Sequence, residues 1–238
     1  MATINAQPHG EPHGGPGHDI DAAKRPMWAR YKHGHHFRTQ DDEFDACKTG
    51  MWLFLATEVL LFAGLFMSYT FFRYKYPEAF ANGSNYLDWR WGGLNTVVLL
   101  ISSYTAAMAV RNAQLDQQKA LQRNLLITVV CGALFVVIKA VFEYGPKWAQ
   151  GKRPGEWFSY PFAHDAMEPA WWSVYYSATG IHALHVLIGM ALLYRCYLRA
   201  KRGAYGPTHY TMVENAALYW HLVDLIWIYL FPLLYLIA

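Results

Sequence analysis

Residues 49–72 read TGMWLFLATEVLLFAGLFMSYTFF, an apolar run with one carboxylate, Glu58, near its middle. At about 1.5 Å of rise per residue, a helix over this run reaches across a hydrocarbon core about 30 Å thick. An ionised Glu58 at that depth costs about 2.5 to 3.5 kcal/mol, so this residue must be protonated, paired, or turned toward protein. The stretch therefore predicts a membrane-spanning helix that packs against other helices.

Composition supports a membrane protein with one membrane domain. The chain has 238 residues and is 54% apolar. Its mean hydropathy is close to zero because a polar tail over residues 1–47 offsets several strongly apolar segments. The net charge of +3 is spread along the chain, so we expect no nucleic-acid partner. Cys47, Cys131 and Cys196 are widely spaced and form no CxxC motif, so we interpret them as small apolar fillers.

Four further apolar runs follow the first. We predict an all-α fold, an integral membrane bundle of five transmembrane helices within residues 48–238, with spans over residues 49–72, 94–111, 125–143, 171–194 and 214–238. The Gly-, Pro- and His-rich tail before them is expected to be partly disordered. Its histidines lack a fixed frame for metal, so we interpret them as part of a solvated arm: His9, His13, His18, His33, His35 and His36.

Charge on the connecting segments predicts the orientation. With the N-terminus in the cytoplasm, thirteen Lys and Arg residues lie on the cytoplasmic side and six on the other. The positive-inside rule therefore favours a cytoplasmic N-terminus and, after five spans, a periplasmic C-terminus in the bacterial inner membrane.

Polar residues inside or beside the spans are the candidate functional residues: Glu58, His182, His185, Glu214, His221 and Asp224. Ala178, His182, His185 and Gly189 recur at helical spacing, so we expect this stripe to face neighbouring helices and not lipid. His221 and Asp224 are expected to hydrogen-bond to each other or to neighbouring helices.

Lys139 and Glu143 lie four residues apart at the end of the third span. They could pair on one helical face. We instead expect both side chains to extend toward the interface, because long charged side chains near a helix end reach the headgroups.

Two function classes can be drawn from these residues alone. An autonomous b-type cytochrome would use His182 and His221 as axial ligands, although helix-to-helix hydrogen bonds explain them as well. A proton-coupled transporter would use Glu58, but such proteins have repeated halves and helices broken near the midplane. Neither feature is evident in this sequence, where Pro232 is the one proline inside a predicted span.

Four segments together resemble subunit III of the haem-copper terminal oxidases, in that family's order and spacing. They are KTGMWLFLATEVLLFAGLF, LNTVVLLISSYTAAMAV, ATGIHALHVLIG and YWHLVDLIWIYLFPLLY. The resemblance covers roughly residues 48–238. It implies an accessory subunit of a proton-pumping oxidase that reduces oxygen to water in an aerobic respiratory chain.

The resemblance also implies the partners. Subunits I and II carry the haems and copper, so no cofactor or metal is expected in this chain. A small subunit IV, membrane lipids and a supercomplex with a cytochrome c reductase are further expected partners. Glu58 resembles the family's buried carboxylate close to subunit I, the other five polar residues match its polar framework, and Arg199 resembles an arginine that contacts the phosphate of a bound phospholipid.

Many members of the family have seven spans, and here the polar tail replaces the first two. Five-span members also occur among quinol oxidases and nitric oxide reductase accessory proteins, so these stay open as alternatives to a cytochrome c oxidase. Our hypothesis is that Glu58 is mostly protonated and supports proton uptake or lipid and oxygen access. The alternative is that it makes one interhelical hydrogen bond with a structural role only.

Overall fold

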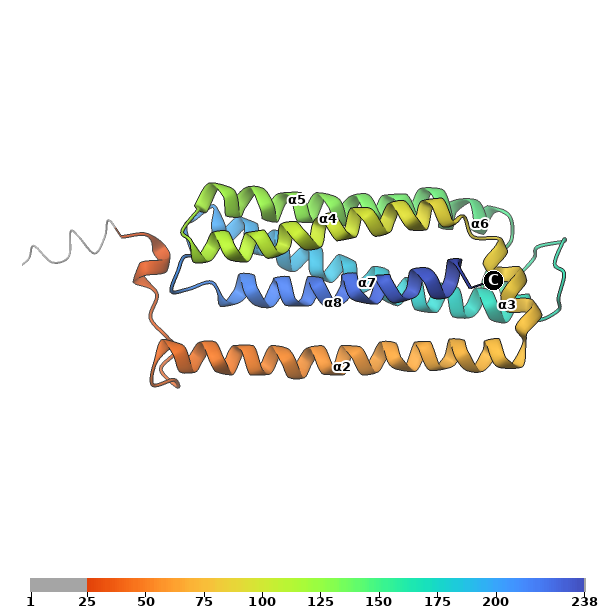
Figure 1. Ribbon diagram of the computed structural model, residues 1–238, viewed down its shortest axis with the longest axis horizontal. Coiled ribbons are helices and arrows are strands. Elements are labelled where there is room, and N and C mark those ends of the chain that lie inside the picture. Colours follow the sequence, from red (N-terminus) through yellow and green to blue (C-terminus); the bar gives the residue numbers. More distant parts are fainter. Residues whose placement is uncertain (1–24, 238) are drawn as a thin grey trace, which may run out of the picture.

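Five long helices make up most of the computed structural model, which describes residues 25–237 (Figure 1). The helices long and apolar enough to cross a membrane are α2 (Gln40–Lys75), α4 (Trp89–Gln114), the continuous run from α5 (Gln118–Ile138) to α6 (Gly145–Ala149), α7 (Glu168–Ala200) and α8 (Thr211–Tyr235). Short helices stand between them: η1 (Met27–Arg30), α3 (Pro77–Asn85) and η3 (Gly155–Trp157). The predicted all-α bundle of five transmembrane helices is confirmed, and the described residues form no strand.

Each long helix begins before the apolar run from which it was predicted, and all except α8 also extend past its end. α2 begins at Gln40, nine residues before the expected span, because Thr39 forms a capping box with Asp42. Its 36 residues are about 54 Å long, so its first turns lie outside the hydrocarbon core. A hydropathy analysis detects only the apolar middle of such a helix, whereas capping residues determine where the helix begins and ends.

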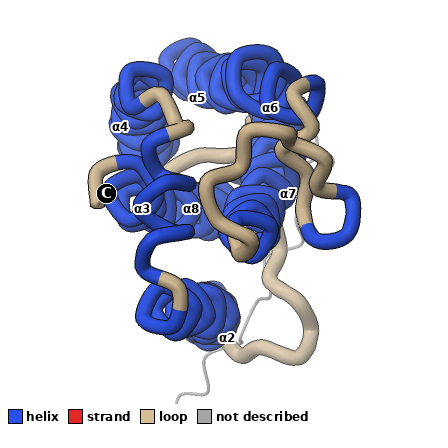
Figure 2. Tube along the Cα trace, turned by 90° about the vertical axis from the view of Figure 1, so that its right-hand side faces the viewer, coloured by secondary structure: helices blue, strands red, loops and turns tan. Residues whose placement is uncertain are grey.

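Four spans form a bundle, and α2 lies along one side of it. Figure 1 shows α2 parallel to the long axis below α8, and the end view in Figure 2 places it apart from α4 and α5. Only 11% of the most apolar 18-residue stretch of α2 is buried, against 50% of the corresponding stretch of α8. α2 contacts the bundle through one face, where Leu55, Phe62 and Tyr69 recur every seven residues and are buried.

Glycines let α5 and α7 approach the Trp220 side chain of α8. A Cβ atom on Gly189 would lie 2.8 Å from Trp220, and one on Gly132 would lie 2.6 Å from it. The predicted stripe on α7 does face its neighbours, since Ala178, His182 and Gly189 are buried.

The segment before α2 packs on the loop between α7 and α8. The backbone N–H of Trp28 donates to Gly203 O at 3.2 Å, and the Trp28 ring covers Gly206. Tyr31 stacks on His209 with ring centroids 3.7 Å apart. Residues 27–39 therefore cover one end of the bundle, whereas the tail histidines His9, His13 and His18 lie outside the described residues.

Candidate functional site

Glu58 and His185 form a hydrogen-bonded pair between α2 and α7. The distance from Glu58 Oε2 to His185 Nε2 is 2.7 Å, and the two side chains are 15% and 12% exposed. Both residues were singled out in the sequence, and the structure brings them together across 127 positions of the chain. The pair ties the middle of α2 to the middle of α7.

The hydrogen bonds of His185 determine how many protons the pair holds. His185 Nδ1 lies 2.7 Å from the carbonyl oxygen of Ile181, which can only accept, so Nδ1 carries a hydrogen. The contact between Nε2 and Glu58 then needs one further proton, either on the carboxyl or on the imidazole. In both cases the pair is neutral overall, which suits its depth in a membrane.

Aromatic side chains surround this pair. Phe62 of α2 packs its ring edge against His185 at 5.1 Å, and Tyr219 of α8 stacks on His185 at 6.4 Å. Phe54 in turn stacks on Tyr219 at 6.0 Å. This apolar surrounding strengthens the hydrogen bond and raises the cost of any net charge.

His182, one turn from His185, is enclosed in the bundle interior. Its ring stacks on Trp227 at 5.4 Å and meets Phe135 edge-on at 5.6 Å. Neither ring nitrogen has a hydrogen-bond partner within residues 25–237. A porphyrin does not fit between these rings, so the residues present do not support His182 as an axial haem ligand.

His221 and Asp224 do not bond to each other. His221 Nδ1 instead lies 2.7 Å from Ser103 Oγ and so joins α8 to α4. A bond to a neighbouring helix was one of the two expected arrangements. The Asp224 carboxylate is buried, and its oxygens have no partner in the described part of the chain.

Glu214 and Arg199 lie at the end of the bundle that residues 27–39 cover. Glu214 pairs with Lys48 at 3.0 Å, and this pair is partly exposed. Arg199 Nη1 donates to Met212 Sδ at 3.2 Å and lines a polar cavity of about 590 Å³ together with Glu43, His209 and Asn215. The structure thus separates Glu214 and Arg199 from the Glu58–His185 pair.

A polar cluster in the bundle interior contains Lys139 and Glu143, whose pairing was the alternative to an interfacial position. Lys139 and Glu143 pair at 2.6 Å and are 6% and 1% exposed, so the expectation that they extend toward the interface is wrong. They lie on η2 (Lys139–Tyr144), a π-helical segment that continues α5 into α6. The π turn widens the helix and keeps both side chains inside the bundle.

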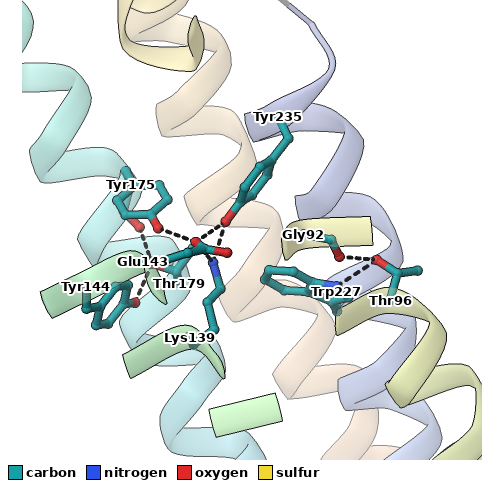
Figure 3. Close-up of polar contacts among 9 residues, drawn as sticks. All are labelled: Gly92, Thr96, Lys139, Glu143, Tyr144, Tyr175, Thr179, Trp227 and Tyr235. Atoms are coloured by element: carbon teal, nitrogen blue, oxygen red, sulfur yellow. Dashed lines mark hydrogen bonds and ion pairs between the residues drawn. The ribbon is translucent and has the colours of Figure 1, made fainter. Parts of the chain in front are cut away.

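Three helices supply the hydrogen bonds of this cluster (Figure 3). Glu143 Oε2 accepts from Lys139, from the Tyr175 hydroxyl of α7 at 2.9 Å, and from the Tyr235 hydroxyl of α8. Beside it, the Tyr144 hydroxyl donates to Thr179 Oγ1 at 2.6 Å. The cluster therefore joins α7 and α8 to the end of the third span.

One sequence signal could have revealed the cluster. The predicted span ends at residue 143 and so places Lys139 and Glu143 at the headgroups, but Gly145 and Pro146 follow, and proline is well suited to the first turn of a further helix. Because the helix continues to Ala149, the pair lies well inside it.

The described residues do not assemble a metal site. Within residues 25–237, no three His, Cys, Asp or Glu side chains lie close enough together to hold an ion. His33, His35 and His36 are exposed at the surface.

Comparisons with known proteins agree with this architecture. A family model described as cytochrome c oxidase subunit III matches residues 28–238. Cytochrome c oxidase subunit 3 of Synechocystis sp. is 31% identical over 209 residues, which cover 86% of this chain and 79% of that protein. The subunit 3 proteins of Latimeria chalumnae and Drosophila yakuba are 32% and 30% identical, and each alignment covers 78% of this chain and 67% of the relative.

The match to the family model spans all five long helices and contains Glu58, His182 and His185. The comparisons confirm the resemblance found in the sequence. The chain belongs to the cytochrome c oxidase subunit III family.

Proposed function

We propose that the chain is the accessory third subunit of a proton-translocating cytochrome c oxidase in a bacterial inner membrane. In this proposal subunits I and II carry the haems and copper, and this chain stabilises subunit I and supports proton uptake without a redox centre of its own. A small subunit IV and a cytochrome c reductase are further partners. The charge distribution supports a cytoplasmic N-terminus and a periplasmic C-terminus.

The exposed side of α2 supports a partner in the membrane. Ala63, Gly64 and Ser68 are exposed there, and nothing in the described chain lies within 4 Å of a Cβ built on Gly64. Small residues let the backbones of two membrane helices approach closely.

The Glu58–His185 pair is the observation that carries the proposed proton role. It holds one exchangeable proton at mid-membrane depth, between the helix that would meet subunit I and the bundle. A carboxyl and an imidazole in contact can move that proton with no change in the charge of the pair. The alternative role is that of an interhelical tie.

Two substitutions at Glu58 separate these roles. In Glu58→Gln the amide can still donate to His185 Nε2, so the tie persists while the exchangeable proton is lost. Glu58→Leu removes both. We expect Glu58→Gln to assemble normally but to lower the pumping ratio or the catalytic lifetime of the oxidase, and Glu58→Leu to impair assembly as well. If Glu58→Gln matches the wild type in turnover, pumping and lifetime, the pair serves only as a tie.

Lipid binding is proposed at two places. Arg199 is suited to a lipid phosphate, because its guanidinium lies partly exposed at the predicted cytoplasmic end of α7. An apolar groove of about 660 Å³ between α2 and α8, lined by Trp52, Val59 and Leu222 among others, suits an acyl chain. Loss of bound phospholipid from Arg199→Ala, measured by native mass spectrometry, tests the first place.

Cytochrome c is the proposed electron donor, because the three relatives compared above are cytochrome c oxidase subunits. A quinol oxidase or a nitric oxide reductase accessory protein is the alternative within the same architecture. Oxidation of cytochrome c by the purified complex, with quinol as the comparison substrate, distinguishes them.

A further inference from the structure

Polar side chains recur along one face of α7, from the middle of the helix to its beginning. They are spaced three or four residues apart, which places them on one helical face. The members of this polar row are His185, His182, Thr179, Tyr175, Trp172 and Glu168. All except His185 are almost fully buried. The row therefore leads through the bundle interior to the end where α7 begins, which we call the Glu168 end.

The row does not continue in the other direction. The same face of α7 then carries Gly189, Leu193, Cys196 and Ala200, of which only the Cys196 thiol can hydrogen-bond. Gly189 is closed off by the Trp220 ring of α8. The polar connection from the middle of α7 thus runs to one side of the membrane only.

Several atoms along this row are buried without a partner. They are His182 Nδ1 and Nε2, Trp172 Nε1, Glu168 Oε2 and, beside Tyr175, Glu143 Oε1. Each exposes less than 1 Å², and none has a hydrogen-bond partner within the described range of 25–237. Buried polar atoms of this kind are commonly satisfied by internal water.

There is room for water beside the row. Between α5 and α7 lies a cavity of about 130 Å³, and its lining includes Lys139, Tyr144, Thr179 and Ala183. Of these, the Tyr144 and Thr179 hydroxyls face each other, whereas the Lys139 ammonium is turned toward Glu143 and Tyr235 (Figure 3).

The chemistry of the unpaired atoms selects the ligand. Trp172 Nε1 can only donate, carboxylate oxygens such as Glu168 Oε2 accept, and the neutral ring of His182 needs one partner of each kind. An acyl chain satisfies none of them, whereas water satisfies all.

We propose that the polar row of α7 binds a chain of water molecules from the Glu168 end to His182. The chain brings exchangeable protons from the predicted periplasmic side to within one helical turn of the Glu58–His185 pair. This inference does not depend on the proposed role of that pair in proton uptake.

Radiolytic hydroxyl-radical labelling of the intact complex in native membranes tests the water chain, because radicals formed from bound water mark the side chains beside it. Trp220 and Trp227 are matched controls for Trp172. All three are 0% exposed, but Trp220 Nε1 donates to Ser102 Oγ at 2.9 Å and Trp227 Nε1 to Thr96 Oγ1 at 3.0 Å. We expect labelling of Trp172 and His182 several-fold above both controls. Labelling equal to that of the controls would overturn the proposal.

A cavity-filling variant tests the path of the water. Ala183→Leu fills the cavity beside Thr179, between Trp172 and His182 along the row. We expect labelling of His182 to fall to the level of Trp220 while labelling of Trp172 persists. Ala191→Leu makes the same substitution at an exposed position of α7 and should change neither. Unchanged labelling of His182 in Ala183→Leu contradicts a chain that passes Thr179.

Discussion

Lys139 and Glu143 form an ion pair of 2.6 Å inside the bundle, on the π-helical segment η2 that joins α5 to α6. The Tyr235 hydroxyl contacts both, since it accepts from Lys139 and donates to Glu143. One ion pair thus fixes the ends of α5, α7 and α8 relative to one another. Its buried setting makes the energetic effect of removing one charge different from that of removing both.

Removing a single partner of this pair should be costly. Glu143→Leu leaves the Lys139 ammonium buried without its carboxylate, and loss of one partner of a buried pair typically costs about 3 to 5 kcal/mol. The double variant Lys139→Met with Glu143→Leu should unfold at a higher denaturant concentration than either single variant. SDS titration in mixed micelles measures the three free energies of unfolding. Additive effects would show that the two charges do not depend on each other.

Gly189 and Gly180 provide a matched comparison on α7. Gly189→Ala would place a Cβ atom 2.8 Å from Trp220, so we expect the overpacking to destabilise the bundle by about 1 to 3 kcal/mol. Gly180→Ala meets nothing within 4 Å in the described chain, and alanine favours a helix over glycine by about 1 kcal/mol. The two variants should therefore shift the thermal unfolding midpoint in opposite directions. A similar shift in both would mean that α7 and α8 are less closely packed at Gly189 than described.

The docked N-terminal segment should respond to pH through His209. Burial, with a smaller contribution from Arg199, lowers the pKa of His209 below its ordinary value of 6.5, although Glu43 opposes the change. The undocked state then binds the proton more tightly, so docking is strongest above pH 6.5 and weakens as the pH falls below it.

Hydrogen exchange of residues 27–39 at about pH 7.5 and about pH 5, corrected for the intrinsic rate, measures this weakening. His209→Phe keeps the stack on Tyr31 without a titratable group and should abolish the pH dependence. Equal pH dependence in that variant and the wild type would assign the effect to another group.

The spans could be predicted because their apolar runs are long and uniform, and a carboxylate such as Glu58 is conspicuous among leucines. That His185 is the hydrogen-bond partner of Glu58 could not be predicted. His185 was singled out on α7, but which helix lies beside α2 depends on packing between segments that are more than a hundred residues apart. The sequence left open whether His221 and Asp224 bond to each other or to neighbouring helices, and the structure shows His221 bonded to Ser103 of α4.

The helix ends were the least predictable part. Residues 40–47 were assigned to the tail because they are polar, yet a capping box at Thr39 begins α2 there. Similarly, Lys139 and Glu143 follow an apolar run, and hydropathy alone places them at its edge. A backbone detail, the π turn, keeps them inside.

We proposed that this chain is an accessory subunit of a cytochrome c oxidase and has no redox centre of its own. Purification in mild detergent through an affinity tag on this chain, followed by an optical spectrum before and after the chain is dissociated, tests it most directly. We expect the haem absorption to copurify with the intact complex and to remain entirely with the other subunits after dissociation. A Soret band that stays with the isolated chain would contradict the account.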